Sequence, residues 1–274
     1  MRLCTYLGSD GARAGLVEDG VVRPLAEPDL LALVRAGAPA RAAAGGRAVP
    51  LSEAVLLAPL RPGTLIGVGL NYRDHAAETG AALPAEPLLF AKLTSAVAPP
   101  GGPVARPPYT EELDYEGELA VVIGRRAANV TVADALGHVF GYAIMDDLTA
   151  RDRQRAEPQW LRAKSGDGFA PFGPWITTAD QVPDPQALGI RTWVNGELRQ
   201  DGTTRDMVFS VASLVSYCSA QLTLQPGDVI TTGTPAGVGA GRRPPSFLRP
   251  GDRVRIEIDG LGTLEHEIVE PGRG

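Results

Sequence analysis

Short apolar segments separated by turns that contain glycine or proline recur from Thr64 to the C-terminal region, and this pattern limits the folds open to the chain. The segments read LIGVGL, LLFAKL, ELAVVIG, VFGYAIM, IRTWVNG, DVITTGT and DRVRIEID. Their length and their content of β-branched residues are typical of β-strands. The sequence therefore predicts an α+β domain that is mostly β and contains few long helices.

The residues before the turn at positions 61–63 are predicted to form a small unit of their own. Short strands are expected at residues 2–7 and 15–17, and an alanine-rich helix at residues 28–36. We therefore expect a small N-terminal domain at residues 1–60 and a larger domain at residues 61–274. The best candidate helix of the larger domain covers residues 209–222, with Ser210 as its N-cap and apolar residues at helical spacing.

Charge and composition exclude several classes of protein. The chain has 274 residues, a net charge of −6 and no block of basic residues, which argues against a nucleic-acid partner. It lacks an apolar run long enough to cross a bilayer and the apolar stretch of a secretory signal, so we expect a cytoplasmic protein without a membrane partner. The two cysteines, Cys4 and Cys218, do not suggest a disulfide framework, and we expect both to be buried.

Lysine is scarce in this chain, since Lys92 and Lys164 are the only lysines among 26 basic residues. Arginine therefore meets nearly every general need for positive charge. A lysine can serve a specific purpose, because its compact ammonium group fits beside an oxyanion where a planar guanidinium does not. Chance placement on the surface explains the two positions equally well at this stage.

Two groups of acidic residues are candidate metal ligands. Glu116 and Glu118 precede an apolar run, and on a strand their side chains would project to the same side. Asp147 or Asp146, at the end of the apolar stretch 139–144, could supply a third carboxylate, and Mg²⁺ prefers such oxygen ligands. The competing interpretations are a solvated strand face for the glutamates and a helix N-cap for Asp147.

Two further segments carry polar groups that could act in catalysis or binding. On a helix, His75 and Glu78 share one face, so the carboxylate can orient the imidazole as a general base, although a surface pair is an equally good interpretation. The glycine-rich segment 231–239 follows a strand, and its N–H groups could hold an anion such as a substrate carboxylate. A plain tight turn explains the same segment, and its spacing does not match a phosphate loop.

The order of these motifs resembles the fumarylacetoacetate hydrolase family over roughly residues 61–270. The matching motifs are GLNYRDHAAE, LDYEGELAVVIG, DDLTARD, AKS, VNGELRQ and TTGTPAGVG. The resemblance implies a mixed β-sandwich roll with a small N-terminal domain, in a protein that forms a homodimer. It also implies a divalent metal, Mg²⁺ with Mn²⁺ or Ca²⁺ as substitutes, held by Glu116, Glu118 and Asp147.

The same resemblance assigns roles to six other residues. It implies that His75 and Glu78 form a water-activating dyad and that Lys164 is a cation near the metal. It implies substrate contacts at Arg151, Gln154 and Thr234.

The implied substrate is a small 2-oxo acid, and the implied branch contains bacterial acylpyruvases and hydroxyheptadienedioate isomerases. We expect hydrolysis of an acylpyruvate-type β-diketo acid to pyruvate and a carboxylic acid. Decarboxylation or tautomerisation through the same metal-bound enolate is the alternative, and a non-catalytic metal-binding homologue is less favoured. Two positions depart from the family pattern, namely Gly166, which is expected to widen or loosen the pocket wall, and Gly117, whose effect the sequence does not predict.

Overall fold

The computed structural model describes residues 1–37 and 46–272, which form three β-sheets and a few short helices. The strands are β1 Arg2–Gly8, β2 Gly11–Glu18, β3 Val21–Pro24, β4 Val49–Pro50, β5 Leu56–Leu57, β6 Leu65–Gly69, β7 Leu88–Lys92, β8 Val97–Ala98, β9 Pro103–Ala105, β10 Leu113–Asp114, β11 Gly117–Ile123, β12 Val139–Asp146, β13 Thr149–Ala150, β14 Ala170–Thr178, β15 Gly189–Val194, β16 Glu197–Thr203, β17 Val229–Thr231, β18 Arg253–Ile258 and β19 Gly262–Val269. The protein is therefore mostly β, as predicted.

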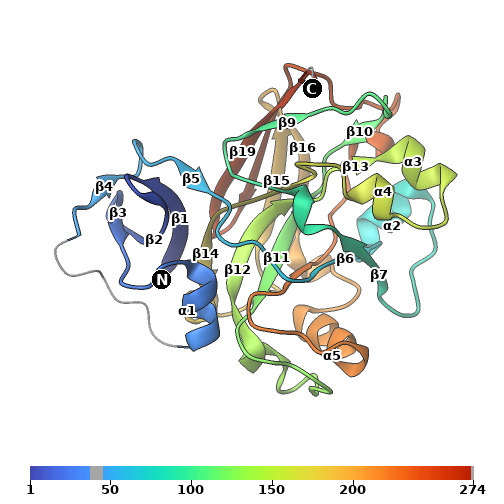
Figure 1. Cartoon of the computed structure of the whole chain (residues 1–274). Coiled ribbons are helices and arrows are strands. Elements are labelled where there is room, and N and C mark those ends of the chain that lie inside the picture. Colours follow the sequence, from blue (N-terminus) through green and yellow to red (C-terminus); the bar gives the residue numbers. More distant parts are fainter. Residues whose placement is uncertain (38–45, 273–274) are drawn as a thin grey trace.

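The largest sheet runs through most of the molecule (Figure 1). Its main path is β4-β3-β2-β1-β14-β12-β11-β17-β6-β7, and it is mixed, because β17 and β6 are parallel whereas most other pairs are antiparallel. The N-terminal strands join this sheet through β1, which pairs with β14. The predicted boundary near residue 60 lies between β5 and β6, and independent folding of residues 1–60 stays a prediction.

A second sheet of five strands, in the order β16-β15-β18-β19-β9, packs against the central strands of the first. Buried apolar side chains fill the space between them, including Leu119 of β11, Ile144 of β12 and Ile256 of β18. Gly117 lets the two sheets approach closely, because a side chain at this position would collide with Thr192 of β15. This arrangement is the mixed β-sandwich that was expected.

The helices are short and lie at the ends and edges of the sheets (Figure 1). The α-helices are α1 Leu30–Ala36, α2 Arg73–Thr79, α3 Arg151–Ala156, α4 Leu161–Lys164 and α5 Val211–Gln221, and the 3₁₀ segments are η1 Thr94–Ala96, η2 Ala135–His138, η3 Ala179–Gln181, η4 Thr204–Asp206 and η5 Gly239–Gly241. Helix α5 confirms the predicted helix, and the Ser210 side chain caps it by accepting from the Ser213 N–H. None of the helices in the described part of the chain is long and apolar enough to cross a bilayer.

Candidate active site

Three carboxylates meet where β11 begins and β12 ends. Glu116 immediately precedes β11, Glu118 lies within it, and Asp147 follows β12. Each offers an oxygen atom that lies within 4.8 Å of the others, and all three residues are buried. The backbone joins the two strand ends, because the Asp147 N–H donates to the Glu116 carbonyl at 2.9 Å. The alternation predicted for the glutamates is thus observed, and Asp147 is not a helix N-cap, because Ala150 occupies that position before α3.

Both lysines of the chain approach this group of carboxylates. Lys164 Nζ, from α4, lies 2.6 Å from Glu116 Oε2 and 2.6 Å from Asp147 Oδ2. Lys92 Nζ, from the end of β7, lies 2.5 Å from Asp147 Oδ1. No role for Lys92 is evident from the sequence alone, although the rarity of lysine in this chain singles the residue out. Neither lysine is a chance surface residue, since both are buried.

The electrostatics of the three carboxylates fit a divalent cation. Burial opposes ionisation of Glu116, but Lys164 and Arg151 outweigh burial and hold the Glu116 pKa below its ordinary value. Burial, reinforced by the neighbouring carboxylates, raises the pKa of Glu118 well above its ordinary value. The negative charges of Asp147 and Glu116 therefore oppose ionisation of Glu118. A bound Mg²⁺ prefers carboxylate oxygens and would relieve this repulsion, so the residues fit the implied metal.

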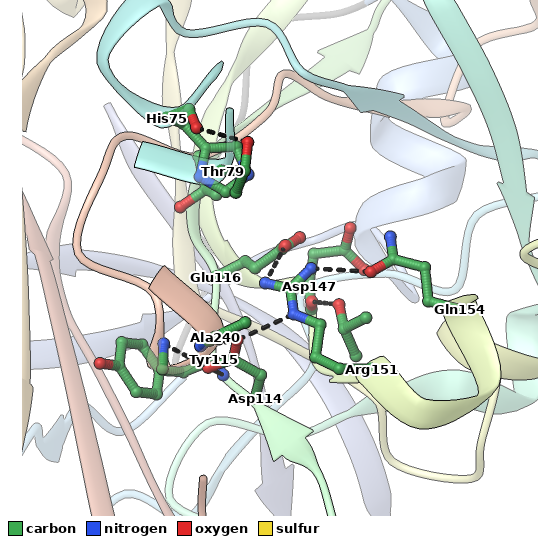
Figure 2. Close-up of polar contacts among 12 residues, drawn as sticks. His75, Thr79, Asp114, Tyr115, Glu116, Asp147, Arg151, Gln154 and Ala240 are labelled. Atoms are coloured by element: carbon green, nitrogen blue, oxygen red, sulfur yellow. Dashed lines mark hydrogen bonds and ion pairs between the residues drawn. The ribbon is translucent and has the colours of Figure 1, made fainter. Parts of the chain in front are cut away.

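Arg151 connects the carboxylates to the wall of the site. Its Nε donates to Asp114 Oδ2 at 2.8 Å, its Nη1 donates to Gln154 Oε1 at 2.9 Å, and its Nη2 pairs with Glu116 Oε1 at 2.6 Å. Figure 2 shows the guanidinium among these acceptors. Burial opposes the charge on Arg151, but Glu116 and Asp114 outweigh burial and raise its pKa. Arg151 therefore stays cationic. Within residues 1–37 and 46–272, the Gln154 amide nitrogen donates no hydrogen bond and can serve as a donor.

Helix α2 holds the histidine–glutamate pair that the spacing predicted. His75 Nδ1 lies 2.8 Å from Glu78 Oε1, so the second ring nitrogen is the one available for chemistry. Gly80 ends the helix in a left-handed conformation. The side chains of His75 and Glu78 are 8% and 18% exposed, which is far lower than expected for a surface pair.

The glycine-rich segment after β17 does hold anions, but they belong to the protein itself. The N–H of Gly233 donates to Glu118 Oε2 at 2.9 Å, and that of Gly237 donates to Glu78 Oε2 at 2.9 Å. The N–H groups of Gly239 and Ala240 donate to Asp114, at 2.7 and 3.0 Å. The expectation that the N–H groups of residues 231–239 bind a substrate carboxylate is therefore wrong for Gly233, Gly237 and Gly239, because protein carboxylates already occupy these three donors. These hydrogen bonds instead hold the side chains of Glu118, Glu78 and Asp114 against one backbone segment. Asp114 is also the partner of Arg151.

A cavity of about 290 Å³ opens beside these groups. The cavity brings together seven of the nine residues assigned by resemblance, with Glu78 and Asp147 directly behind its wall. Its lining residues are Val68, Gly69, Leu70, His75, Thr79, Ala81, Glu116, Glu118, Arg151, Gln154, Arg155, Trp160, Lys164 and Thr234. The Thr234 hydroxyl donates to the Gly117 carbonyl and accepts from Gln200.

Gly166 does not line this cavity, so the expectation that it widens the pocket wall is wrong. It lies in a separate hollow with Leu93, Tyr109 and Leu161. A β-carbon added at Gly166 would lie 2.7 Å from the Tyr109 hydroxyl and 2.8 Å from the Phe169 ring. The space that a side chain would need is therefore filled from the neighbouring segments.

A buried His266–Asp146 pair lies behind the carboxylates and was not predicted. His266 Nε2 lies 2.7 Å from Asp146 Oδ2, and Asp146 Oδ1 accepts from the Glu116 N–H at 2.8 Å. Asp146, which the sequence left open as a possible ligand, thus supports the backbone of a candidate ligand. The two partners are 120 positions apart, so sequence spacing gave no signal.

Two family models together match nearly the whole chain. Residues 64–269 match the family model described as the C-terminal part of fumarylacetoacetate (FAA) hydrolase, and residues 1–59 match one described as Rv2993c-like, N-terminal. The chain is 45% identical over 224 residues to mitochondrial oxaloacetate tautomerase FAHD2B of Bos taurus, covering 81% of this chain and 71% of that protein.

Solved structures show the same fold over nearly the whole chain. The fumarylacetoacetate hydrolase of Exiguobacterium antarcticum has a TM-score of 0.91 and 39% identity, covering 99% of this chain and 100% of that one. The maleylpyruvate hydrolase of Sphingobium sp. SYK-6 has a TM-score of 0.81 and 34% identity, with the same coverage of 99% and 100%.

Proposed function

The chain belongs to the fumarylacetoacetate (FAA) hydrolase family, and from this membership we propose that it is a divalent-metal-dependent hydrolase that cleaves a carbon–carbon bond of an acylpyruvate-type β-diketo acid. The products are pyruvate and a carboxylic acid. One observation carries the proposal. His75 lines the same cavity as two of the three clustered carboxylates, Glu116 and Glu118. Cleavage by water needs a site for the 2-oxo acid and a base for the water, and this cavity offers both.

Glu116, Glu118 and Asp147 would hold the metal, with Mg²⁺ as the proposed ion and Mn²⁺ or Ca²⁺ as substitutes. When bound, the ion supplies orientation and charge stabilisation at the 2-oxo acid end of the substrate. Lys164 adds a fixed positive charge beside the same carboxylates, where negative charge develops during cleavage. Burial would lower the Lys164 pKa, but Asp147 and Glu116 outweigh burial and raise it, so the lysine remains charged.

His75 acts as the general base in this proposal. Glu78 fixes the ring through Nδ1, which leaves the other ring nitrogen to remove a proton from water. The hydroxide oxygen attacks the distal carbonyl carbon of the substrate. The bond between that carbon and the adjacent CH₂ carbon then breaks, and its electron pair passes into the enolate form of pyruvate. A proton returns to the enolate carbon, so one water is consumed for each bond cleaved.

Three further cavity residues are proposed substrate contacts. The Gln154 amide nitrogen is available as a donor, and Arg151 contributes its positive charge from the buried end. Thr234 keeps one hydroxyl lone pair beyond the bonds to Gly117 and Gln200. These contacts would orient the substrate rather than take part in proton transfer.

Turnover of acetylpyruvate by the magnesium-loaded protein tests the proposal. We expect stoichiometric pyruvate and acetate, loss of activity with EDTA, and recovery when Mg²⁺ is added. The matched control is Glu118→Gln, which removes one carboxylate charge from the site and should not recover with Mg²⁺. Absence of acetate under conditions in which Mg²⁺ binds would contradict the hydrolase assignment.

Tautomerisation of a 2-oxo acid is the second candidate function, because the chain is 45% identical to a protein named oxaloacetate tautomerase. Keto–enol exchange needs proton transfer beside a stabilised enolate, which the same residues can provide. The decay of enol absorbance after dissolving enol-oxaloacetate measures this activity directly, and carbon dioxide release would reveal decarboxylation instead. Fast enol decay without acetylpyruvate cleavage would favour this second candidate.

Homodimer formation and a cytoplasmic location are also proposed from the family resemblance and the sequence. Light scattering of the purified protein should give about twice the chain mass of 28.7 kDa. We propose a small 2-oxo acid as the binding partner of the site and neither nucleic acid nor membrane as a partner of the protein, consistent with its net charge of −6.

A further inference from the structure

A histidine of the five-stranded sheet reaches across the sandwich to the strand end that precedes a candidate metal ligand. His266 lies in β19 of that sheet, and Asp146 is the last residue of β12 in the large sheet. His266 Nε2 lies 2.7 Å from Asp146 Oδ2, and neither side chain is exposed to solvent. This polar contact therefore joins the two sheets in the interior of the protein, directly behind the three carboxylates.

The Asp146 side chain connects this contact to the backbone of Glu116. The ladder between β11 and β12 begins at Gly117, which pairs with Asp146, so Glu116 lies just before its first pair. The Asp147 N–H donates to the Glu116 carbonyl at 2.9 Å. The Glu116 N–H donates not to the facing backbone but to Asp146 Oδ1, at 2.8 Å. Asp146 thus holds the backbone of one candidate ligand and directly precedes another.

The second ring nitrogen of His266 indicates which partner donates in the buried pair. His266 Nδ1 is buried and has no hydrogen-bond partner among residues 1–37 and 46–272. A buried N–H without a partner is rarer in proteins than an acceptor without one, so the ring proton belongs on Nε2. His266 therefore donates to Asp146 Oδ2. Loss of this donor would leave one oxygen of a fully buried carboxylate without a partner, which is unfavourable.

We propose that His266 is a positioning residue that sets the affinity of the metal site, because it fixes Glu116 through Asp146. This inference rests on the metal proposed at Glu116, Glu118 and Asp147, but not on the proposed reaction. A ligand that is already held in place loses less freedom on binding, so its supports raise metal affinity. Within the described part of the chain, His266 forms no hydrogen bond with the three candidate ligands and does not line the cavity beside them. Its effect on the metal passes through Asp146.

Magnesium calorimetry on the full chain tests the proposal without any turnover. His266→Leu removes the donor and should weaken Mg²⁺ binding by about 10- to 100-fold, the usual effect of removing a hydrogen-bonded support of a metal ligand. His266→Gln should restore most of the lost affinity, because the glutamine amide nitrogen can donate from the position of Nε2. Asp146→Ala should also weaken binding. Adding His266→Leu to Asp146→Ala should cause little further loss, because both residues act through the same carboxylate.

Val254→Ala is the matched control for a loss of packing. Val254 is paired with His266 between β18 and β19 and is 1% exposed, but its side chain carries no polar group. Urea denaturation in EDTA should show that Val254→Ala and His266→Leu both lower the free energy of unfolding. Only His266→Leu should weaken Mg²⁺ binding.

Three results would overturn the proposal. They are parent-like Mg²⁺ affinity in His266→Leu, an equal loss of affinity in Val254→Ala, and a loss in His266→Gln as large as that in His266→Leu. A parent protein that binds no Mg²⁺ would remove the proposed metal and this inference together. The expected pattern of affinities without cleavage of acetylpyruvate would instead remove only the proposed reaction.

Discussion

The ammonium group of Lys92 lies 2.5 Å from Oδ1 of Asp147, and neither side chain is exposed to solvent. Burial lowers the pKa of Lys92, although Asp147 opposes this effect. Asp147 also accepts from Lys164, so two lysines bind the two oxygens of one candidate metal ligand. The carboxylate is therefore held in place, and its charge compensated, before any metal arrives.

Replacing Lys92 with methionine should destabilise the metal-free protein more than the magnesium-loaded protein. Loss of one partner from a buried ion pair typically costs about 3–5 kcal/mol, because the remaining charge lacks compensation. Mg²⁺ would supply that compensation to Asp147, so part of the loss should be recovered when it binds. Chemical denaturation of the parent and Lys92→Met, each with EDTA and with saturating Mg²⁺, measures both differences. An equal loss of unfolding free energy in both conditions would show that Lys92 acts through packing alone.

His75→Ala should lower the rate of acetylpyruvate cleavage without weakening metal binding. Removing a general base typically costs about 10²–10⁴-fold in rate, and His75 is not one of the three candidate ligands. Glu78→Gln should give a smaller loss, because the ring is retained but loses its charged partner. Steady-state kinetics together with magnesium calorimetry separates the two properties. A large loss of magnesium affinity in His75→Ala would contradict this division of roles.

Gly237→Ala should reduce catalysis through the position of Glu78. Gly237 has a φ of 106°, and a β-carbon here would collide with the Arg199 carbonyl, so the loop must shift. Its N–H donates to Glu78, whose other oxygen orients His75. We expect a loss in kcat of about 10²-fold, the effect of a displacement near 1 Å.

The control for this substitution is Gly251→Ala. Gly251 has a similar φ of 94°, but among the described residues no atom beyond its immediate chain neighbours lies within 4 Å of the added β-carbon. Both variants carry the strain of alanine at positive φ, whereas only Gly237 contacts the dyad. Similar kcat values for the two variants would show that backbone strain, rather than Glu78, explains the loss.

The parts of the site that sequence predicted correctly are those set by local geometry. Strand alternation places Glu116 and Glu118 together, and one helical turn joins His75 to Glu78. Both relations depend on backbone periodicity, which the order of residues specifies. In the same way, turn-separated apolar segments predicted the strands, and Ser210 marked the start of α5.

The features that sequence did not provide depend on contacts between distant segments. Lys92 meets Asp147 across 55 positions and His266 meets Asp146 across 120. The glycine-rich segment was predicted to bind a ligand anion, because sequence shows its free N–H groups but not the carboxylates folded against them. Gly166 was misassigned for a related reason, since the Tyr109 hydroxyl, from a distant segment, fills this position together with the nearby Phe169 ring. Only the assembled sandwich defines these neighbours.

Both cysteines are free and buried, as predicted. Their burial makes the free energy of unfolding depend on pH in the alkaline range. Burial raises the pKa of Cys4 to about 12 and that of Cys218 to about 11. In the unfolded chain a thiol titrates near its ordinary pKa, about 8.5. Above that pH the unfolded state loses the proton while the folded state keeps it. The folded state then binds more protons, so its stability falls as pH rises.

The contribution of the two thiols to the unfolding free energy should therefore be constant below about pH 8. Between pH 8 and 10 it should fall by up to about 1.4 kcal/mol per pH unit for each cysteine. Urea denaturation at pH 7, 8, 9 and 10 measures the slope, and Cys4→Ala should flatten it. Val22→Ala is the control, because Val22 packs in the same small cluster as Cys4 but does not titrate. It should lower the unfolding free energy by a similar amount at every pH and leave the slope unchanged. A Cys4→Ala slope equal to that of the parent would mean that the folded protein exposes this thiol to hydroxide, contrary to its burial in β1.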